Sequence, residues 1–204
     1  MKTEAKTKHD VVSQFRCAGI LAAARKVFAD KGFSAATVDE IADAAGLAKG
    51  TLYLYFPSKR DIYLAAFREG VEELAAASRD AMAAAPNMRE KLRAYVGTRL
   101  RYVEEHRDFY KIYHAEFGNL THPASVSNWF AGIYREQLEL LAGLLGQAVE
   151  SGEVRAIPIE PMASAIYGVV KEMMLRRILG SSVVPVEQDV EALCEIVWNG
   201  IGER

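Results

Sequence analysis

Residues 48–60, with the sequence AKGTLYLYFPSKR, bring together side chains that readily contact a polyanion. The stretch holds three cations, two tyrosines and two hydroxyl side chains, and it holds no acidic residue. Such groups donate hydrogen bonds to phosphate oxygens and so fix how a protein docks on a duplex, while the first turn of a helix reaches base edges in the major groove. This composition predicts contact with DNA.

Two short helices and a tight turn are expected to position this stretch. Residues 37–40, TVDE, have the form of a capping box, in which the Thr hydroxyl and the Glu carboxylate satisfy each other's backbone amides. A helix is therefore predicted over 38–45, with Gly46 at its end. A third helix is predicted from near Ala48 to Phe56, because a residue that precedes proline is disfavoured in the α region. The pair has the dimensions of a helix-turn-helix.

The net charge of -2 argues against a nucleic-acid partner when it is taken for the whole chain. Residues 1–60, however, hold ten Lys and Arg against six Asp and Glu, a balance of +4, and the remaining 144 residues hold fifteen against twenty-one, a balance of -6. One end of the chain therefore suits a polyanion and the other does not.

The rest of the chain predicts helices as well. Half of the residues are apolar and a quarter are charged, which is typical of a globular protein, and no segment alternates with the two-residue period of a strand. A helix from Ser58 to about Ala85 would be about 40 Å long at 1.5 Å per residue, so we expect both halves of the molecule to share it. Other helices are expected over about 15–31, 92–103, 109–117, 124–151, 158–180 and 186–200.

Residues 37–59, TVDEIADAAGLAKGTLYLYFPSK, together with Phe28, Gly32 and Phe33, resemble the DNA-binding domain of the TetR family, the tetracycline-repressor-like regulators of bacteria. The resemblance covers about the first 70 residues. It implies an all-α fold of about nine helices, in which an N-terminal three-helix domain is joined by a long fourth helix to a C-terminal helical domain. Residues 1–60 would then bind DNA, with the helix-turn-helix at about 37–56, and residues 61–204 would bind an effector and dimerise.

The resemblance also implies roles for individual residues. In the family pattern Thr37 caps the second helix and touches phosphate, Tyr53 and Tyr55 bind phosphate, and Lys59 anchors to the DNA backbone. The first turn of the third helix faces the groove, where Lys49 is suited to guanine O6 and N7. Taken singly, Lys49 would more often be a surface lysine and each tyrosine a packing residue; the joint pattern favours DNA. The predicted DNA-contact set is Thr37, Val38, Ala48, Lys49, Gly50, Thr51, Tyr53, Tyr55 and Lys59.

The last two helices are the candidates for a dimer contact, because specific binding by one helix-turn-helix usually pairs two half-sites through a two-fold axis. These helices combine small residues that permit close approach with large apolar ones. The family resemblance adds that TetR-like proteins pair through an equivalent four-helix bundle. The alternative is that these faces are core of the monomer. The predicted contact residues are Ala165, Gly168, Val169, Leu175, Ile178, Val197, Trp198 and Ile201.

Between the two ends lies an aromatic and Met-rich region, which predicts core and an apolar ligand cavity between helices. Arg99 and Glu116 lie on the apolar stripes of their helices, where an unpaired ion is costly. They are expected either to pair with each other or to face a polar group of a ligand, and the structural pairing is favoured. The predicted effector-contact residues are Arg99, Tyr102, Phe109, Tyr113, Glu116, Phe117, Trp129, Ile133, Tyr134, Met173 and Met174.

An enzyme, a metal site and a cofactor are not expected. His106, His114 and His122 are eight residues apart, so successive members would lie about 80° out of register on one helix. The sequence also lacks a GxSxG motif, a phosphate-binding glycine loop and a cysteine-histidine pairing. It lacks an apolar run of the roughly 18 to 20 residues that a membrane span needs, so a cytoplasmic protein without a membrane partner is expected.

The sequence thus predicts a homodimeric repressor that binds a palindromic operator and is released by a small apolar or amphipathic molecule, with repression adopted because it is the usual mode of the family. The helix from Ser58 to about Ala85 is the expected lever between the two halves. Two alternatives remain open. One is an all-α lipid-binding or interaction protein that retains a helix-turn-helix fold, and the other is a regulator that activates or has no small-molecule effector.

Overall fold

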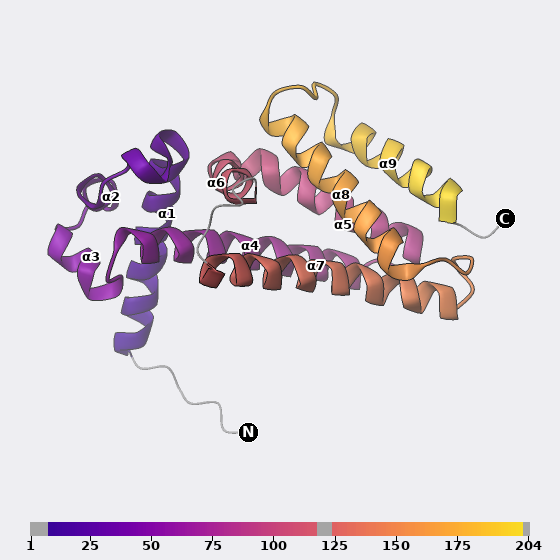
Figure 1. Cartoon of the computed structure of the whole chain (residues 1–204), viewed down its shortest axis with the longest axis horizontal. Coiled ribbons are helices and arrows are strands. Elements are labelled where there is room, and N and C mark those ends of the chain that lie inside the picture. The colour runs from indigo at the N-terminus through magenta and orange to yellow at the C-terminus, as the bar shows by residue number, and fades with distance from the viewer. Residues whose placement is uncertain (1–7, 118–123, 202–204) are drawn as a thin grey trace.

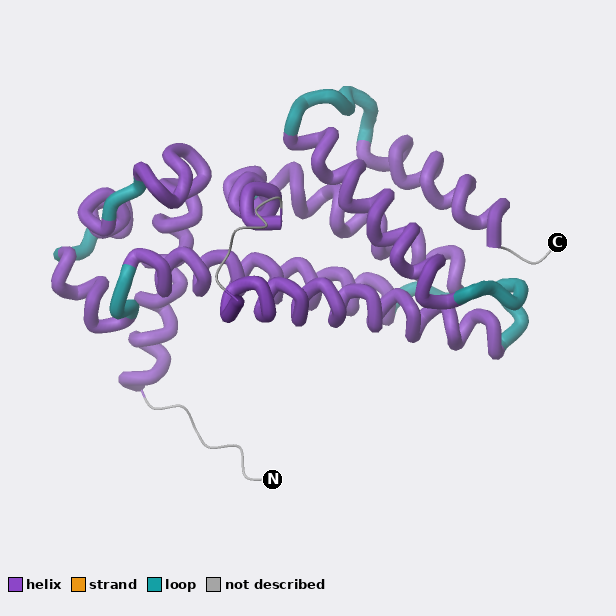
Figure 2. The backbone as a smooth tube through the Cα atoms, viewed as in Figure 1, coloured by secondary structure: helices purple, strands orange, loops and turns teal. Residues whose placement is uncertain are grey.

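A computed structural model describes the backbone of residues 8–117 and 124–201, and the side chains of residues 12–112 and 131–200. These residues form nine helices and no strand, which confirms the all-α prediction. Three helices lie at one end of the molecule and five at the other, and the fourth runs between them (Figure 1). Loops and turns join the helices (Figure 2). No described helix is both long and apolar enough for a bilayer crossing.

The N-terminal end consists of α1 (Lys8–Ala35), α2 (Val38–Ala45) and α3 (Lys49–Tyr55). The helix α1 is longer than expected at both ends: it begins at Lys8, and its last turn continues beyond Gly32, where φ is 72° and ψ is 169°. Only glycine adopts this conformation readily, so the predicted stop at Gly32 takes the form of a kink. The small core of this end includes Ile20, Ala24, Phe28, Ile41 and Leu52.

The helix α4 (Lys59–Ala83) packs against α1 at one end and against α5 (Met88–Glu105) along its length. Its 25 residues span about 38 Å. Ser58 caps α4 by accepting a hydrogen bond from the Asp61 amide, as its sequence signature predicts. Because Ile62 and Phe67 are fully buried, the first turns of α4 belong to the hydrophobic core that joins the two ends.

The C-terminal end is built around α5, which packs on α4, α8 (Ile159–Ile178) and α9 (Val186–Ile201). The helix α7 (Ala124–Glu150) packs on α8, and α6 (Arg107–Phe117) packs on α1. The helix α6 thereby brings the C-terminal end into direct contact with the N-terminal end. The largest fully buried side chains here are Tyr95, Tyr110, Phe109, Leu92, Leu100, Leu141 and Leu145.

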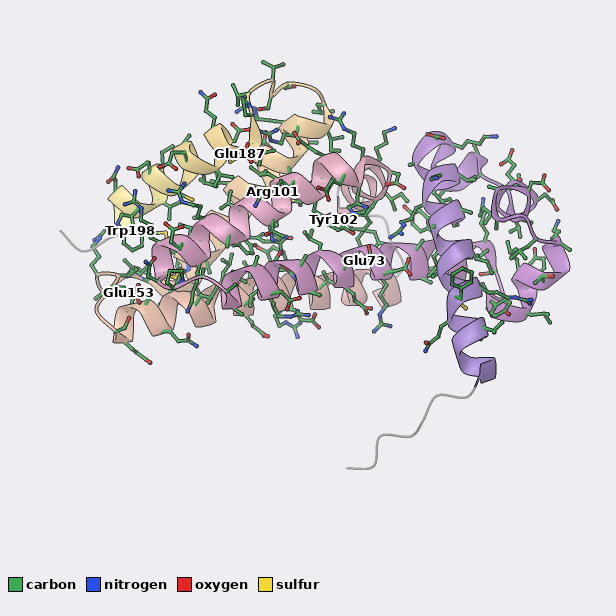
Figure 3. The ribbon with its side chains drawn as sticks, turned by 180° about the vertical axis from the view of Figure 1, so that it is seen from behind. Glu73, Arg101, Tyr102, Glu153, Glu187 and Trp198 are labelled. Carbon is green, nitrogen blue, oxygen red and sulfur yellow. The ribbon has the colours of Figure 1, made fainter. Side chains whose placement is uncertain are left out.

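Ion pairs tie α9 to α5 along one side. Arg89 pairs with Glu195, Arg93 pairs with Glu191, and Arg101 lies 3.5 Å from Glu187. Arg101 and Glu187 are seen together in Figure 3. Successive arginines lie about one and two turns apart on α5, and successive glutamates lie about one turn apart on α9, so the members fall on one side of each helix.

Candidate nucleic-acid interface and effector site

The capping box that the sequence predicts is present at the start of α2. Thr37 Oγ1 accepts from the Glu40 amide at 3.2 Å, and Glu40 Oε2 accepts from the Thr37 amide at 3.0 Å. Lys31 Nζ donates to the other carboxylate oxygen of Glu40 at 2.7 Å. The Lys31 hydrogen bond and the Thr37 amide both lower the pKa of Glu40. The start of α2, next to the predicted interface, is therefore held by a reciprocal set of hydrogen bonds.

The helix α3 exposes most of the residues predicted to face a groove. Ala48, Lys49, Gly50 and Tyr53 are exposed, Thr51 and Tyr55 are half-buried, and Leu52 lies in the core as predicted. Thr37 is exposed as well, whereas the Val38 side chain is buried. Any DNA contact by Val38 would therefore come from its backbone amide, in the first turn of α2, where amides lack an acceptor within the helix.

Lys49 is not a free cation. Its Nζ donates to Asp39 Oδ2 at 2.8 Å, and both side chains remain largely exposed. The hydrogen bond and charge of Asp39 raise the pKa of Lys49, so the ammonium stays protonated. The sequence analysis missed this pair, because Asp39 lies ten positions earlier and on another helix.

Lys59 has hydrogen-bond acceptors within the chain, and its predicted contact with the DNA backbone stays a prediction. Its Nζ lies 2.7 Å from the Phe33 carbonyl oxygen, 3.3 Å from that of Ser34 and 2.8 Å from that of Ala36. The ammonium also lies 4.6 Å from the centre of the Phe33 ring. An ammonium has three donors, and all three have acceptors here. In this structure Lys59 therefore holds the corner between α1 and α2, and a contact with the DNA backbone would require it to leave that corner.

A polar cluster joins the two ends of the molecule. Arg25 of α1 lies 3.5 Å from Glu69 and 3.4 Å from Glu73 of α4, and the Tyr102 hydroxyl of α5 donates to Glu73 Oε2 at 2.9 Å. Glu73 and Tyr102 are labelled in Figure 3. Partial burial raises the pKa of Glu69, and Arg25 opposes that shift. The cluster is a direct polar connection between α1 and α5 through α4.

Phe109 of α6 packs beside this cluster. Its ring lies against Gly70, where a Cβ atom would come within 2.3 Å of the ring, and edge-on to Tyr102 at 5.9 Å. Burial raises the pKa of Tyr102 well above its ordinary value, and the hydrogen bond to Glu73 adds to that shift. Tyr102 and Phe109 thus have structural contacts, and their predicted contact with an effector stays a prediction.

Arg99 lies in the core of the C-terminal end, but its described partner is neutral. Its Nη2 donates to Gln137 Oε1 of α7, and its guanidinium lies 4.5 Å from the centre of the Tyr95 ring. Glu116, the carboxylate predicted to pair with it, lies outside the residues whose side chains the structure describes. The sequence analysis missed Gln137 and Tyr95 as partners, although Gln137 is a polar residue on the apolar stripe of its helix.

The other predicted effector residues divide into three groups. Ile133 and Met174 are buried in the core, and Met173 is half-buried. Tyr134 is partly exposed and meets the Tyr167 ring edge-on at 5.3 Å. The side chains of Tyr113, Phe117 and Trp129 lie, like that of Glu116, outside the described residues. A pocket of about 200 Å³ opens between α4 and α7, with Ile133 and Gln137 in its wall.

The predicted dimer face is partly exposed. Ala165, Gly168 and Val169 of α8 are exposed. The half-buried members are Leu175 and Ile178 of α8 and Val197 and Trp198 of α9. Ile201 lies outside the described side chains. Trp198 is partly used within the subunit, because the Arg89 guanidinium lies 5.9 Å from its ring centre. Ile196 of α9, which the prediction omitted, is 72% exposed.

A family model described as bacterial regulatory proteins, tetR family, matches residues 20–66. The HTH-type transcriptional repressor KstR2 of Rhodococcus jostii is 30% identical over 137 residues, which make up 67% of this chain and 67% of that protein. The chain belongs to the tetR family. The matched segment of this tetR-family chain contains the capping box, Lys49 and Lys59, and it ends before Arg99.

Further comparisons extend the likeness. The HTH-type transcriptional activator FasR of Mycolicibacterium smegmatis is 39% identical over 93 residues, and this match spans 46% of the chain and only 42% of the activator. The crystal structure of the regulator FadR from Bacillus subtilis, in complex with stearoyl-CoA, superposes with a TM-score of 0.78 at 21% identity, over 88% of this chain and 96% of that one. This last likeness extends the tetR-family fold through the C-terminal end.

Proposed function

We propose that this chain is a homodimeric transcriptional regulator that represses from a palindromic operator and is released by an amphipathic small molecule. The observation that carries the proposal is the exposed first turn of α3, with Lys49 at its start, next to the capped N-terminus of α2. An exposed helical turn with donors can enter a major groove while neighbouring groups bind phosphate. Residues 1–60 form the DNA-binding part and residues 61–204 the effector and dimer part.

In this proposal α3 reads the bases. Lys49 donates hydrogen bonds to guanine, and Thr51 bonds a base or a phosphate. The Ala48 methyl contacts a thymine methyl, and Gly50 leaves the surface next to it open. Tyr53 and Tyr55 donate to phosphates on one side. On the other side the Thr37 and Val38 positions present the first turn of α2, whose amides and dipole favour an anion. Lys59 serves to hold the corner beneath α2.

Two subunits pair through α8 and α9, which places two recognition helices on successive major grooves, roughly 34–36 Å apart. Exposed apolar residues on both helices support this choice, since Val169 and Ile196 are left uncovered in one chain. A two-fold contact made by the same surface of each subunit is the commonest solution for a soluble dimer.

The effector acts from the core of the C-terminal end. Its binding changes how α5 and α6 pack on α4 and α1, and the cluster of Arg25, Glu73 and Tyr102 carries that change to the DNA-binding end. A ligand shifts such an equilibrium only by its differential affinity, so a 100-fold loss of operator affinity needs about 3 kcal/mol of coupling. The stearoyl-CoA in the FadR structure supports an amphipathic molecule as the effector class.

The test measures binding of the full chain to the DNA that flanks its own gene, by fluorescence anisotropy at several salt concentrations. We expect affinity to fall steeply with salt while preference over random DNA persists. Lys49→Ala and Thr51→Ala should relax sequence preference, whereas Arg135→Ala, a charge change on an exposed residue of α7, should have no effect. Equal affinity for flanking and random DNA would contradict the proposal and would favour the lipid-binding alternative. A transcription assay from the bound site gives the sign of regulation.

A further inference from the structure

Arg99 is a buried cation without an anionic partner among the described residues. It is 3% exposed, its hydrogen-bond acceptor is the amide oxygen of Gln137, and its Nε is buried without any acceptor. The hydroxyl of Tyr95, four residues earlier on the same face of α5, is also buried without a partner. Two groups with unused donors therefore lie side by side in the core.

Arg177, the other buried arginine among the described residues, has anionic partners. Arg177 is also 3% exposed, but its guanidinium pairs with Glu104 and with Asp189 at 2.5 Å, and it donates to the Val184 carbonyl at 3.1 Å. A buried charge that lacks such partners is costly, because the protein interior replaces water poorly. The Nε of Arg177 also lacks an acceptor, so the two arginines differ in their anions: Arg177 has two carboxylates beside it, whereas Arg99 has none among the described residues.

A pocket lies beside Gln137, the hydrogen-bond partner of Arg99. Gln137 lies in the wall of the 200 Å³ pocket between α4 and α7, and its side chain reaches Arg99. Val71, Ala75 and Ile133 supply the apolar part of its lining, and the charged part consists of Arg68, Arg79, Glu72 and Glu136. Gln137 therefore lines this pocket of mixed polar and apolar character and also contacts the buried guanidinium.

We propose that Arg99 binds the oxyanion head group of the effector, a carboxylate or phosphate at the end of an apolar chain. The head group replaces the Gln137 amide on the guanidinium, whose planar fork matches an oxyanion through two parallel hydrogen bonds. The Tyr95 hydroxyl donates a further hydrogen bond, and the apolar chain lies against Val71, Ala75 and Ile133. This inference rests on the proposed function, because it names the chemical class of the effector.

The experiment compares three probes with the same eight-carbon chain: octanoate, octyl phosphate and octanol. Affinity for the full-length protein is measured by calorimetry, without DNA. We expect octanoate, octyl phosphate or both to bind at least 10-fold more tightly than octanol, and the two oxyanion arms identify which head group fits. Equal affinity for the three probes would overturn the proposal.

Two variants show whether Arg99 is responsible. Arg99→Met keeps much of the volume and removes the charge, so it should abolish the preference for the oxyanion and should unfold at the same or a higher temperature than the wild type without ligand. Gln137→Leu removes the neutral acceptor but keeps the cation, so it should retain the preference and unfold at a lower temperature. Arg135→Met is the surface control. A preference that survives Arg99→Met would refute the assignment.

The readout also separates this inference from the proposed function. If the wild type selects DNA but not the oxyanion, the effector assignment fails and the regulator stands. If the wild type selects the oxyanion through Arg99 but no DNA, the effector class stands and the regulatory role fails.

Discussion

Lys49 Nζ donates to Asp39 Oδ2 at 2.8 Å, so the first turn of α3 is tied to the first turn of α2. One of the three ammonium donors is used in this way, and two remain. Two donors are the number that guanine O6 and N7 accept. The pair therefore restricts where the ammonium can point, and in the proposed complex it would weaken the attraction of α3 for phosphates in general.

Asp39→Asn should make the protein bind random DNA more tightly and discriminate less between sequences. The change frees Lys49 to reach phosphates, so we expect the salt dependence to steepen by about 0.9 in the log-log slope for each subunit. Anisotropy titrations with specific and random DNA measure both effects. Asp43→Asn removes the same charge from an exposed position on α2 without a described contact to Lys49. If both variants alter discrimination equally, the pair has no role in sequence selection.

Lys59→Met should destabilise the DNA-binding end even in the absence of DNA. Its ammonium bonds three carbonyl oxygens at the corner between α1 and α2, and we expect a loss of about 1–3 kcal/mol because hydrogen bonds to charged groups are stronger than neutral ones. Thermal unfolding and hydrogen exchange of residues 33–40 measure this loss. Arg60→Met is the control, since Arg60 is an exposed neighbour. If stability is unchanged and binding to every DNA is weaker, Lys59 acts mainly through the predicted contact with the DNA backbone.

Gly70→Ala should disturb the packing of α6 against α4. The new Cβ would lie 2.3 Å from the Phe109 ring, which is buried and has little room to move. We expect a destabilisation of about 1–3 kcal/mol, typical of overpacking in a core. Chemical denaturation measures it. Gly143→Ala, in α7, meets no atom within 4 Å and should instead stabilise the protein by up to about 1 kcal/mol. Similar changes in the free energy of unfolding of both variants would show that α6 can move to accommodate the added methyl group.

Glu40→Gln should cost stability at neutral pH but not in acid. The pKa of Glu40 is lowered from 4.5 in the folded protein, so the carboxylate contributes stability above the unfolded value, and that contribution is lost as pH falls through the lower, folded value. The difference in melting temperature between wild type and variant should therefore be largest near pH 7 and shrink below about pH 4.5. A difference that is constant over this range would mean that the capping box does not depend on the charge of Glu40.

Ile196→Glu should convert the dimer to monomer. This side chain is exposed on α9 in one chain, and a carboxylate placed in an apolar two-fold contact would meet its own copy or be desolvated. Sedimentation velocity across a concentration series measures the change. Phe15→Glu introduces the same charge at an exposed apolar position of α1 and should leave pairing intact. A monomeric wild type would contradict the proposed dimer outright.

The local elements of the fold were predictable because their signals are local. The capping box at Thr37, the end of α2 at Gly46 and the N-cap at Ser58 each depend on residues within four positions of one another, and all three are present. The extension of α1 past Gly32 was not predicted, because a glycine that would end most helices is bridged here by a single residue in the left-handed region.

The candidate sites were predictable only in part, because pairing between helices is set by tertiary packing. Residue type alone placed Lys49 at the interface and Arg99 in the core, but the contacts of both side chains come from other helices, with Asp39 on α2 and Gln137 on α7. The same is true of Lys59, whose acceptors are backbone carbonyls more than twenty positions away. Every residue has a backbone carbonyl oxygen, so the residue types at these positions do not predict which carbonyls will accept a hydrogen bond.

The helix α5 has two chemically different sides, and this has a consequence for assembly. Tyr95 and Arg99 face the proposed effector, while Arg89, Arg93 and Arg101 hold α9, which carries part of the proposed dimer face. In the proposed dimer, a shift of α5 would therefore reach the neighbouring subunit through α9, without passing through the proposed DNA-binding end. Because linkage is reciprocal, the concentration at which subunits assemble and the affinity for the effector must then vary together.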